Sequence, residues 1–176
     1  ANASSILIDE DWTNNGATFN AGTSTVTWDN DAANGIINGT ASTTFYNVTV
    51  NDTGQSVTLA LATNISNAFT CTAGTFTTSG SNYAMAINGH VLIHGATVQF
   101  NASAVTVAGN WTFSSGTFTA GTSTVTFDSG VAQSINGGST TTFYNVIVTN
   151  ASAVTQNVNA TTGNDFTLTN GTWDTN

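Results

Sequence analysis

The sequence predicts an all-β protein that folds as a β-solenoid (a parallel β-helix) built from tandem repeats. Three observations support this prediction: long blocks of the chain recur, short apolar runs alternate with Thr, Ser or Asn, and clusters of Asn and Gly separate these runs. Repeated short strands that cannot bury an apolar face alone are typical of solenoids, in which neighbouring coils share one core.

The recurring blocks cover most of the chain. The run from Asp11 to Asp29 returns, 99 residues later, as NWTFSSGTFTAGTSTVTFD. TTFYNVTV, at Thr43–Val50, returns 98 residues later as TTFYNVIV, and FTCTAGTF, at Phe69–Phe76, returns 97 residues later as FTLTNGTW. We therefore expect one domain over residues 1–176, with repeat copies at approximately 1–99 and 100–176.

The apolar runs have the two-residue period of half-buried strands. With roughly 20 residues per coil, the chain would form eight or nine coils and a stack roughly 40 Å long. Helix is excluded because the chain has one Glu and no Lys or Arg. An antiparallel β-sandwich with donor-strand exchange stays open as the alternative fold. The expected strands are Ile6–Ile8, Thr25–Trp28, Phe45–Val50, Val57–Leu61, Val91–Ile93, Val105–Val107, Thr124–Phe127 and Phe143–Val148.

Aromatic residues recur within the repeats and should form the core. They stand at matching positions of the repeated blocks, so we expect all of them to be largely buried, and we expect the blocks around Gly22 and Gly121 to share one local structure. The single cysteine, Cys71, should be a small buried hydrophobe, since no second cysteine exists to pair with it. The expected core rings are Trp12, Phe19, Phe69, Phe76, Trp111, Phe118, Phe166 and Trp173.

Composition excludes several classes of function. Nine acidic residues and no basic ones give a formal net charge of −9. A nucleic-acid partner is excluded because no cation is present to replace the counterions of phosphate. Attraction to an anionic membrane fails for the same reason. No apolar run approaches the ~20 residues of a membrane span, so membrane insertion is not expected.

The repeat itself resembles a known kind of sequence. The run NWTFSSGTFTAGTSTVTFDSGVAQSINGGSTTTFYNVIV is similar to the Thr/Gly/Asn-rich repeats of very large secreted surface proteins and adhesins of bacteria and archaea. The resemblance covers nearly the whole chain, and its GTFxAGTSTVTF and TTFYNVxV blocks carry it. It implies a β-solenoid, an extracellular or cell-surface location and a structural or adhesive role without catalytic residues.

No constellation of residues points to catalysis. A β-helix enzyme that degrades acidic polysaccharides would need a positive site for the substrate, and a hydrolase would need paired carboxylates. The repeats keep no such pair, since Gly130 stands at the phase of Asp31. His90 and His94 should lie ~13 Å apart on a strand, too far to share one metal ion. We therefore expect that the chain is not an enzyme and that it requires no cofactor.

Calcium is the one cofactor that the acidic residues suit. Oxygen-rich loops can bind Ca²⁺, and a chain without cations would gain from neutralisation of its carboxylates. The alternative interpretation is that these acids are solvated turn residues. The candidate ligands are Asp9, Glu10, Asp11, Asp29 and Asp31.

Sequons and threonine rows point to the protein surface. A surface-binding module for glycans or ice is an alternative function, because Thr alternates at residues 23, 25 and 27 and again at 122, 124 and 126. Glycosylation of the sequons would suit a secreted protein. The candidate acceptors are Asn2, Asn38, Asn47, Asn51, Asn64, Asn101, Asn110, Asn150, Asn159 and Asn170.

The phases of the chain ends suggest assembly. Asn176 stands at the phase of Ser79 and Ala1 at the phase of Phe100, so joining two copies continues the repeat, short only by residues 80–99. Neither end has an obvious polar cap, and an uncapped stack can template a further subunit. We expect the chain to be secreted and to assemble head to tail with copies of itself into a filament. We expect this homopolymer to have an adhesive or biofilm role and an apolar interface between subunits. The expected interface residues are Ile6, Leu7, Ile8, Trp12, Phe166, Leu168 and Trp173.

Overall fold

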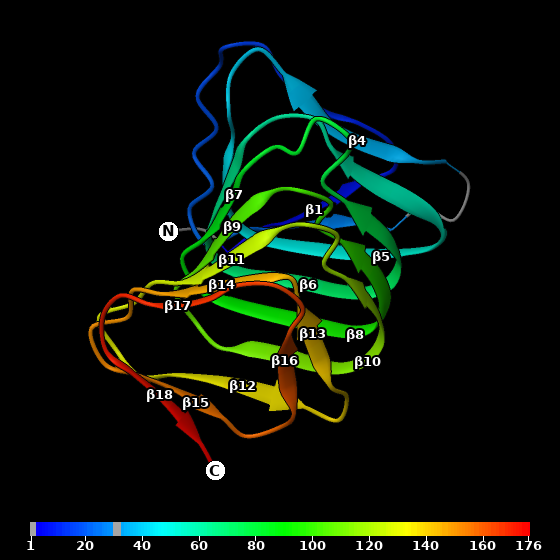
Figure 1. The fold of residues 1–176 in the computed structure, drawn as a ribbon. Helices are drawn as coiled ribbons and strands as arrows, with labels where there is room; N and C mark the ends of the chain where they lie inside the picture. Colours follow the sequence, from blue (N-terminus) through cyan, green and yellow to red (C-terminus); the bar gives the residue numbers. More distant parts are fainter. Residues whose placement is uncertain (1–2, 30–32) are drawn as a thin grey trace.

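A computed structural model describes residues 3–29 and 33–176, and this part of the chain contains strands and turns but no helix. The strands wind into a β-solenoid of about eight turns (Figure 1). The strands are β1 (Ser5–Ile8), β2 (Trp12–Asn14), β3 (Thr25–Trp28), β4 (Gly35–Gly39), β5 (Thr44–Leu59), β6 (Thr63–Thr77), β7 (Met85–Ile87), β8 (His90–Gln99), β9 (Ala104–Val107), β10 (Trp111–Thr119), β11 (Thr124–Phe127), β12 (Gln133–Gly137), β13 (Thr141–Phe143), β14 (Asn145–Val148), β15 (Ala153–Gln156), β16 (Ala160–Thr162), β17 (Phe166–Leu168) and β18 (Thr172–Thr175).

Strand pairing decides between the two folds that the sequence left open. Every strand pair among the described residues is parallel, and each strand pairs with strands about one coil away in the sequence. A coil takes from 19 residues, between Ala153 and Thr172, to 25, between Trp12 and Ile37. The β-solenoid prediction is confirmed, and the antiparallel sandwich is wrong.

The coils have three faces. The first face stacks β1, β3, β5, β6, β8, β10, β12, β15 and β18 in that order. The second face holds β2, β4, the C-terminal parts of the long strands β5, β6, β8 and β10, and then the β13–β16 pair. The third face stacks the N-terminal parts of β5 and β6 on β7, β9, β11, β14 and β17.

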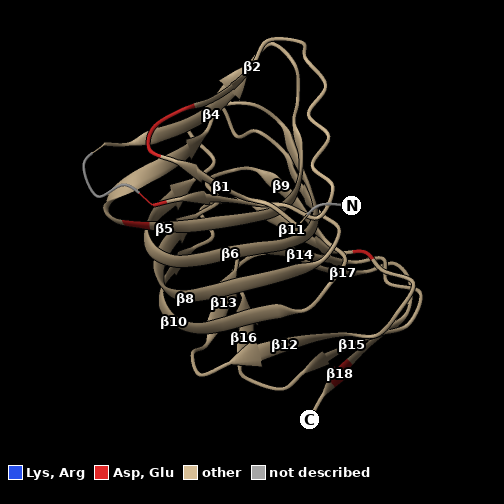
Figure 2. Cartoon of the chain, turned by 180° about the vertical axis from the view of Figure 1, so that it is seen from behind, with Lys and Arg blue, Asp and Glu red and all other residues tan. Residues whose placement is uncertain are grey.

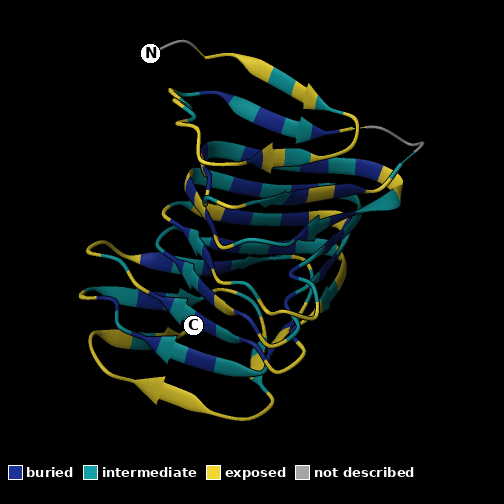
Figure 3. Cartoon of the chain, turned by 90° about the horizontal axis from the view of Figure 1, so that it is seen from above, coloured by how far each residue is buried: buried dark blue, intermediate teal, exposed yellow. Residues whose placement is uncertain are grey.

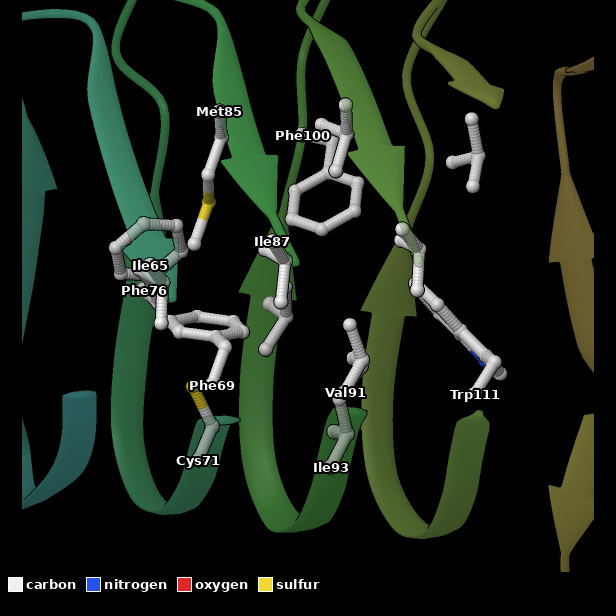
Figure 4. Packing of buried hydrophobic residues seen from close by; sticks show 14 of the residues in the cluster. Ile65, Phe69, Cys71, Phe76, Met85, Ile87, Val91, Ile93, Phe100 and Trp111 are labelled. Carbon is white, nitrogen blue, oxygen red and sulfur yellow. The ribbon is translucent and has the colours of Figure 1, made fainter. Parts of the chain in front are cut away.

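Alternation along each strand builds the core. In all strands except those of the two end coils, inward residues are buried while most of their neighbours are partly or fully exposed, which gives the banded strands of Figure 3. Because paired strands are in register, apolar residues stack from coil to coil. Phe69 lies between Val48 and Val91. Phe69, Val91 and Trp111 follow one another on three successive coils (Figure 4). Shared burial between coils stabilises strands that are too short to be stable alone.

The two repeat copies have the same ring contacts. The ring of Trp12 lies 4.9 Å from that of Phe45, and the ring of Trp111 lies 5.1 Å from that of Phe143. Both pairs are edge-on, a favourable geometry for aromatic rings. These contacts reproduce one local structure twice and confirm the tandem repeat.

Hydrogen bonds repeat as well. The side-chain amide of Asn67 donates to the Asn47 carbonyl oxygen over 2.8 Å, and Asn164 donates to Asn145 over 2.8 Å. The turns at Gly22 and Gly121 have φ angles of 57° and 62°, so the expectation that these blocks share one structure is confirmed. Glycine suits both turns because this left-handed backbone is costly for other residues.

The copies nevertheless occupy different faces of the solenoid. Trp111 lies on the first face, five coils above Ile6. Trp12 is the counterpart of Trp111, but it lies on the second face, one face after Ile6. The copies are therefore related by five turns less one face, or 4⅔ turns. Counterpart strands therefore have counterpart neighbours, but the second copy is rotated by one face about the solenoid axis relative to the first.

Burial of the expected core rings depends on their place in the stack. Phe69, Phe76 and Trp111 are buried, as expected. The expectation is too strong for the other rings, because all except Phe118 belong to the first or last coils and have described strands on one side only. The partly buried rings are Trp12, Phe19, Phe118 and Trp173, while Phe166 is exposed.

Candidate functional site

The N-terminal end face of the stack consists of β1, β2 and residues 17–20. Within the described residues, β1 pairs only with β3 and β2 only with β4, so one edge of each strand has no strand beside it. The rings of Trp12 and Phe19 pack edge-on with centroids 4.7 Å apart, and both rings are partly exposed. The indole nitrogen of Trp12 donates to the Thr43 hydroxyl over 2.9 Å, which fixes the ring at this face.

The C-terminal end face consists of β16, β17 and β18. Each of these strands pairs on one side only among the described residues. Phe166 is 44% exposed and Leu168 is 50% exposed, although both lie in strand positions whose counterparts are buried elsewhere. The rings of Phe166 and Trp173 pack edge-on with centroids 5.0 Å apart.

The same ring pair occurs in the middle of the stack, where it is covered. Phe69 and Phe76 are the counterparts of Phe166 and Trp173, and their rings lie 4.7 Å apart. Both are buried, because β8 pairs with β6 on the side that has no described strand at the C-terminal end face. The exposure of Phe166 thus follows from its position and not from its local sequence.

All of the residues expected at a subunit interface lie on the end coils. They come from four strands, β1 and β2 in one group and β17 and β18 in the other, and the two groups lie at opposite ends of the described stack (Figure 1). Leu7 differs from the rest because it is 67% exposed and pairs with Thr27, whose side chain points away from the core. The N-terminal group is Ile6, Leu7, Ile8 and Trp12, and the C-terminal group is Phe166, Leu168 and Trp173.

Acidic residues lie near both end faces (Figure 2). Asp9, Glu10 and Asp11 are exposed after β1, and Asp165 and Asp174 are exposed beside β17 and within β18. No Lys or Arg exists to neutralise them. The electrostatic term between two such ends is therefore repulsive, and apolar contact and backbone hydrogen bonding must supply any attraction.

The structure describes four of the five candidate calcium ligands. Among the described residues, no group of three or more His, Cys, Asp or Glu side chains lies close enough to hold a metal ion. Asp11 accepts a hydrogen bond from the backbone of Ile36 over 2.9 Å, and Asp29 accepts one from Asn51 over 3.3 Å. The fifth candidate, Asp31, lies outside the described residues.

Neither histidine takes part in a site. His90 and His94 are both exposed on β8. The Nδ1 atom of His90 accepts a hydrogen bond from the backbone nitrogen of Asn110 over 2.9 Å. This bond joins two neighbouring coils, which indicates a structural role for His90.

The sequons differ in accessibility. Asn64, Asn159 and Asn170 are exposed, and Asn2 lies outside the described residues. Asn150 is 0% exposed, and its amide donates to Gln133 over 2.8 Å, so a glycan at Asn150 would displace a buried hydrogen bond. The remaining candidates are partly buried: Asn38, Asn47, Asn51, Asn101 and Asn110.

Two hydroxyl-rich rows on the second face escaped the sequence analysis, which singled out residues 23–27 and 122–126 instead. The rows lie on the outer side of β5, β6, β8 and β10, where paired strands are ~4.8 Å apart. A sequence signal for them exists: the motif aromatic-Thr-x-x-x-Gly-Thr occurs at Phe69–Thr75 and at Trp111–Thr117, and its last threonine begins the second face in both. The rows are Ser56, Thr75, Thr97 and Thr117, and Thr58, Thr77, Gln99 and Thr119.

One open hollow of the described surface, of about 590 Å³, is lined by Leu7, Ile8 and the acidic residues Asp9, Glu10 and Asp11. Another, of about 190 Å³, is lined by Ser42, Thr63, Asn64, Met85 and their neighbours, and has no charged side chain. No helix in the described residues is long and apolar enough to cross a membrane. Comparisons with models of protein families, with curated proteins and with solved structures found no match to this chain.

Proposed function

We propose that this chain is a structural protein that stacks end to end with further copies of itself into an extracellular fibre. The observation that carries the proposal is the pair of end faces, each with unpaired strand edges and partly exposed aromatic rings. Unpaired parallel edges can accept another strand through backbone hydrogen bonds, and the rings lose exposed apolar area when a coil covers them. A head-to-tail contact of this kind propagates into a filament.

A charge placed on one end face tests the proposal. Phe166→Asp should suppress assembly, because a carboxylate would have to be buried against the next copy. Val131→Asp is the matched control, because Val131 is 68% exposed in the turn before β12 and the variant has the same net charge. We expect light scattering and electron microscopy to show filaments for the parent and for Val131→Asp only. Equal assembly of both variants would contradict an interface at Phe166.

The extracellular location and the adhesive or biofilm role rest on the resemblance to surface-protein repeats and on the sequons. Glycans on the outer side of the coils would leave the end faces free to stack. We expect peptide mass spectrometry of protein from its native source to find glycans at Asn64, Asn159 or Asn170 and none at Asn150. Unmodified asparagine at every sequon would remove this support.

A second candidate function is binding of an ordered surface, such as a glycan lattice or ice, through the hydroxyl rows of the second face. The observation that favours it is the regular spacing of these hydroxyls over four coils. Thr75→Tyr with Thr97→Tyr would break the rows without touching the end faces. If this double variant lost binding to ice or glycan while the parent bound, the second candidate would be supported; if the parent bound neither, it would be abandoned.

A further inference from the structure

We infer that the second copy docks in one rotation only, turned by about a third of a turn, with Trp12 stacked on Phe166 and Phe19 on Trp173. This inference rests on the proposed end-to-end assembly and specifies its register. Three features of the described chain lead to it: the spiral form of both ends, the internal counterparts of the two end faces, and the ring pairs that the faces carry.

The first step concerns the spiral. Each coil rises continuously, so the stack ends in a step and not in a flat surface: β18 lies on the first face, one coil above β15, while β16 and β17 still form the top of the other two faces. The N-terminal end has the complementary step at β1. Two such ends meet without a gap only when β1 of one copy follows β18 of the other in the winding order.

The second step concerns the internal counterparts. The C-terminal end face repeats the three segments of β6, and the N-terminal end face repeats β9 and the two segments of β10. Inside the chain, the β7–β8 coil lies between these two surfaces and pairs with both in register. The C-terminal end face is thus the counterpart of the lower neighbour of this coil, and the N-terminal end face is the counterpart of its upper neighbour. Their inward residues therefore lie in the same columns.

The third step concerns the rings. In the internal stack, Phe69 and Trp111 contact Val91 from below and above in the same column. Trp12 is the counterpart of Trp111, and Phe166 is the counterpart of Phe69. When the N-terminal end face of one copy stacks directly on the C-terminal end face of another, without an intervening coil, Trp12 lies on Phe166. The ring pairs have like geometry: the angle between ring planes is 71° at the N-terminal end face and 82° at the C-terminal one. Each pair covers the exposed side of the other, and β1 covers β16.

The geometry of the filament follows. The first face runs from β1 to β18 over eight steps, and the next copy begins one face later, so adjacent copies differ by 8⅓ turns. With ~4.8 Å per coil, the rise is about 40 Å per copy. The rotation is a third of a turn plus the twist accumulated along the stack. After three copies, the same face is displaced from its starting side only by the accumulated twist.

Disulfide trapping tests the register. Thr13, Thr18, Thr167 and Thr172 are all exposed. The proposed register pairs Thr13 with Thr167 and Thr18 with Thr172 across the junction, at the separation of neighbouring strands, which suits a disulfide. The four positions give two matched pairs and two swapped pairs, so each variant has the same number of added cysteines. Cys71 is buried and serves as the background in every variant.

The expected result is a ladder of covalent oligomers after oxidation of assembled Thr13→Cys/Thr167→Cys and Thr18→Cys/Thr172→Cys. The swapped variants, Thr13→Cys/Thr172→Cys and Thr18→Cys/Thr167→Cys, should give monomer bands like those of the parent. Filaments that cross-link through the swapped pairs, or through none, would overturn the register while leaving end-to-end assembly in place. If light scattering detected no filaments of the parent protein, the proposed function itself would be overturned.

Discussion

The two copies of the aromatic cluster have the same internal geometry but different exposure. Trp12 lies 4.7 Å from Phe19, and Trp111 lies 5.0 Å from Phe118. Both indoles also donate to a threonine hydroxyl. Trp111 is 0% exposed because β8 lies beside it, whereas Trp12 is partly exposed because no described strand occupies that place. Local sequence thus sets the contacts within a cluster, and position in the stack sets its burial.

Truncation of the two indoles should give the largest difference between the copies. We expect Trp111→Ala to lower the free energy of unfolding by about 3–5 kcal/mol, since it leaves a cavity in a fully packed column. Trp12→Ala should cost about 1–3 kcal/mol, because part of its ring is already in water. Urea denaturation of the unassembled protein measures both values. Equal costs would mean that the missing neighbour at Trp12 has no energetic consequence.

Backbone strain should, in contrast, be equal in the two copies. Gly39 and Gly137 are counterparts with φ angles of +132° and +131°, and a Cβ at either would overlap the carbonyl oxygen of the coil below, that of Asn14 or of Phe113. We expect Gly39→Ala and Gly137→Ala each to cost roughly 2–4 kcal/mol, because the left-handed backbone and the clash both penalise a side chain.

The control for these glycines is Gly130→Ala, where a Cβ meets no atom within 4 Å. We expect it to change the free energy of unfolding by less than about 0.5 kcal/mol. A clear difference between Gly39→Ala and Gly137→Ala in the same denaturation assay would show that the copies differ in backbone as well as in burial.

The thiol of Cys71 offers a pH-dependent comparison. Burial raises the pKa of Cys71, and its counterpart Leu168 is half exposed. A raised pKa means that the folded state holds the proton more tightly, so stability is unaffected below the unfolded value of about 8.5 and falls as pH rises above it. We expect a decline of up to about 1.4 kcal/mol per pH unit there.

Thiol labelling checks the same comparison at neutral pH. Leu168→Cys should react at the rate of a free thiol, while Cys71 should react only when the chain unfolds. Cys71→Ala provides the reference for the pH series, since it removes the titrating group. Rapid labelling of Cys71 in the parent would contradict its place in the buried column.

Salt should have the smallest effect, and only on assembly. Raising the ionic strength from about 0.01 to 0.15 M shortens the screening length from about 30 to 8 Å, which weakens repulsion between the acidic end faces. We expect a few-fold increase in the rate of assembly by light scattering. Asp174→Asn should reduce this salt dependence more than Asp128→Asn, because Asp174 lies in β18 at the end face and Asp128 follows β11, two coils below β17. Assembly that weakens with salt would contradict repulsion between like-charged ends.

Much of the fold could be predicted from periodicity alone. Alternation of apolar residues with Thr and Asn indicates a strand but does not depend on which strand it pairs with, because the two-residue period is a property of the strand itself. The repeats then predict the shared contacts, such as the bond from Trp111 to Thr141, because counterpart sequences meet counterpart neighbours. The hydroxyl rows of the second face were harder to find, since they join residues one coil apart.

The sequence by itself determined the eight predicted strand segments and the tandem repeat, since each of these depends on neighbours within a few residues or on likeness between blocks. Short strands such as β4, β12 and β18 were not among those segments. Tertiary structure decided parallel pairing, the 4⅔-turn relation between the copies and the exposure of Phe166. A coil takes 19 to 25 residues, and the 99-residue repeat spans 4⅔ coils, which is not a whole number. Burial is a property of the stack because a ring becomes buried only when coils lie on both of its sides.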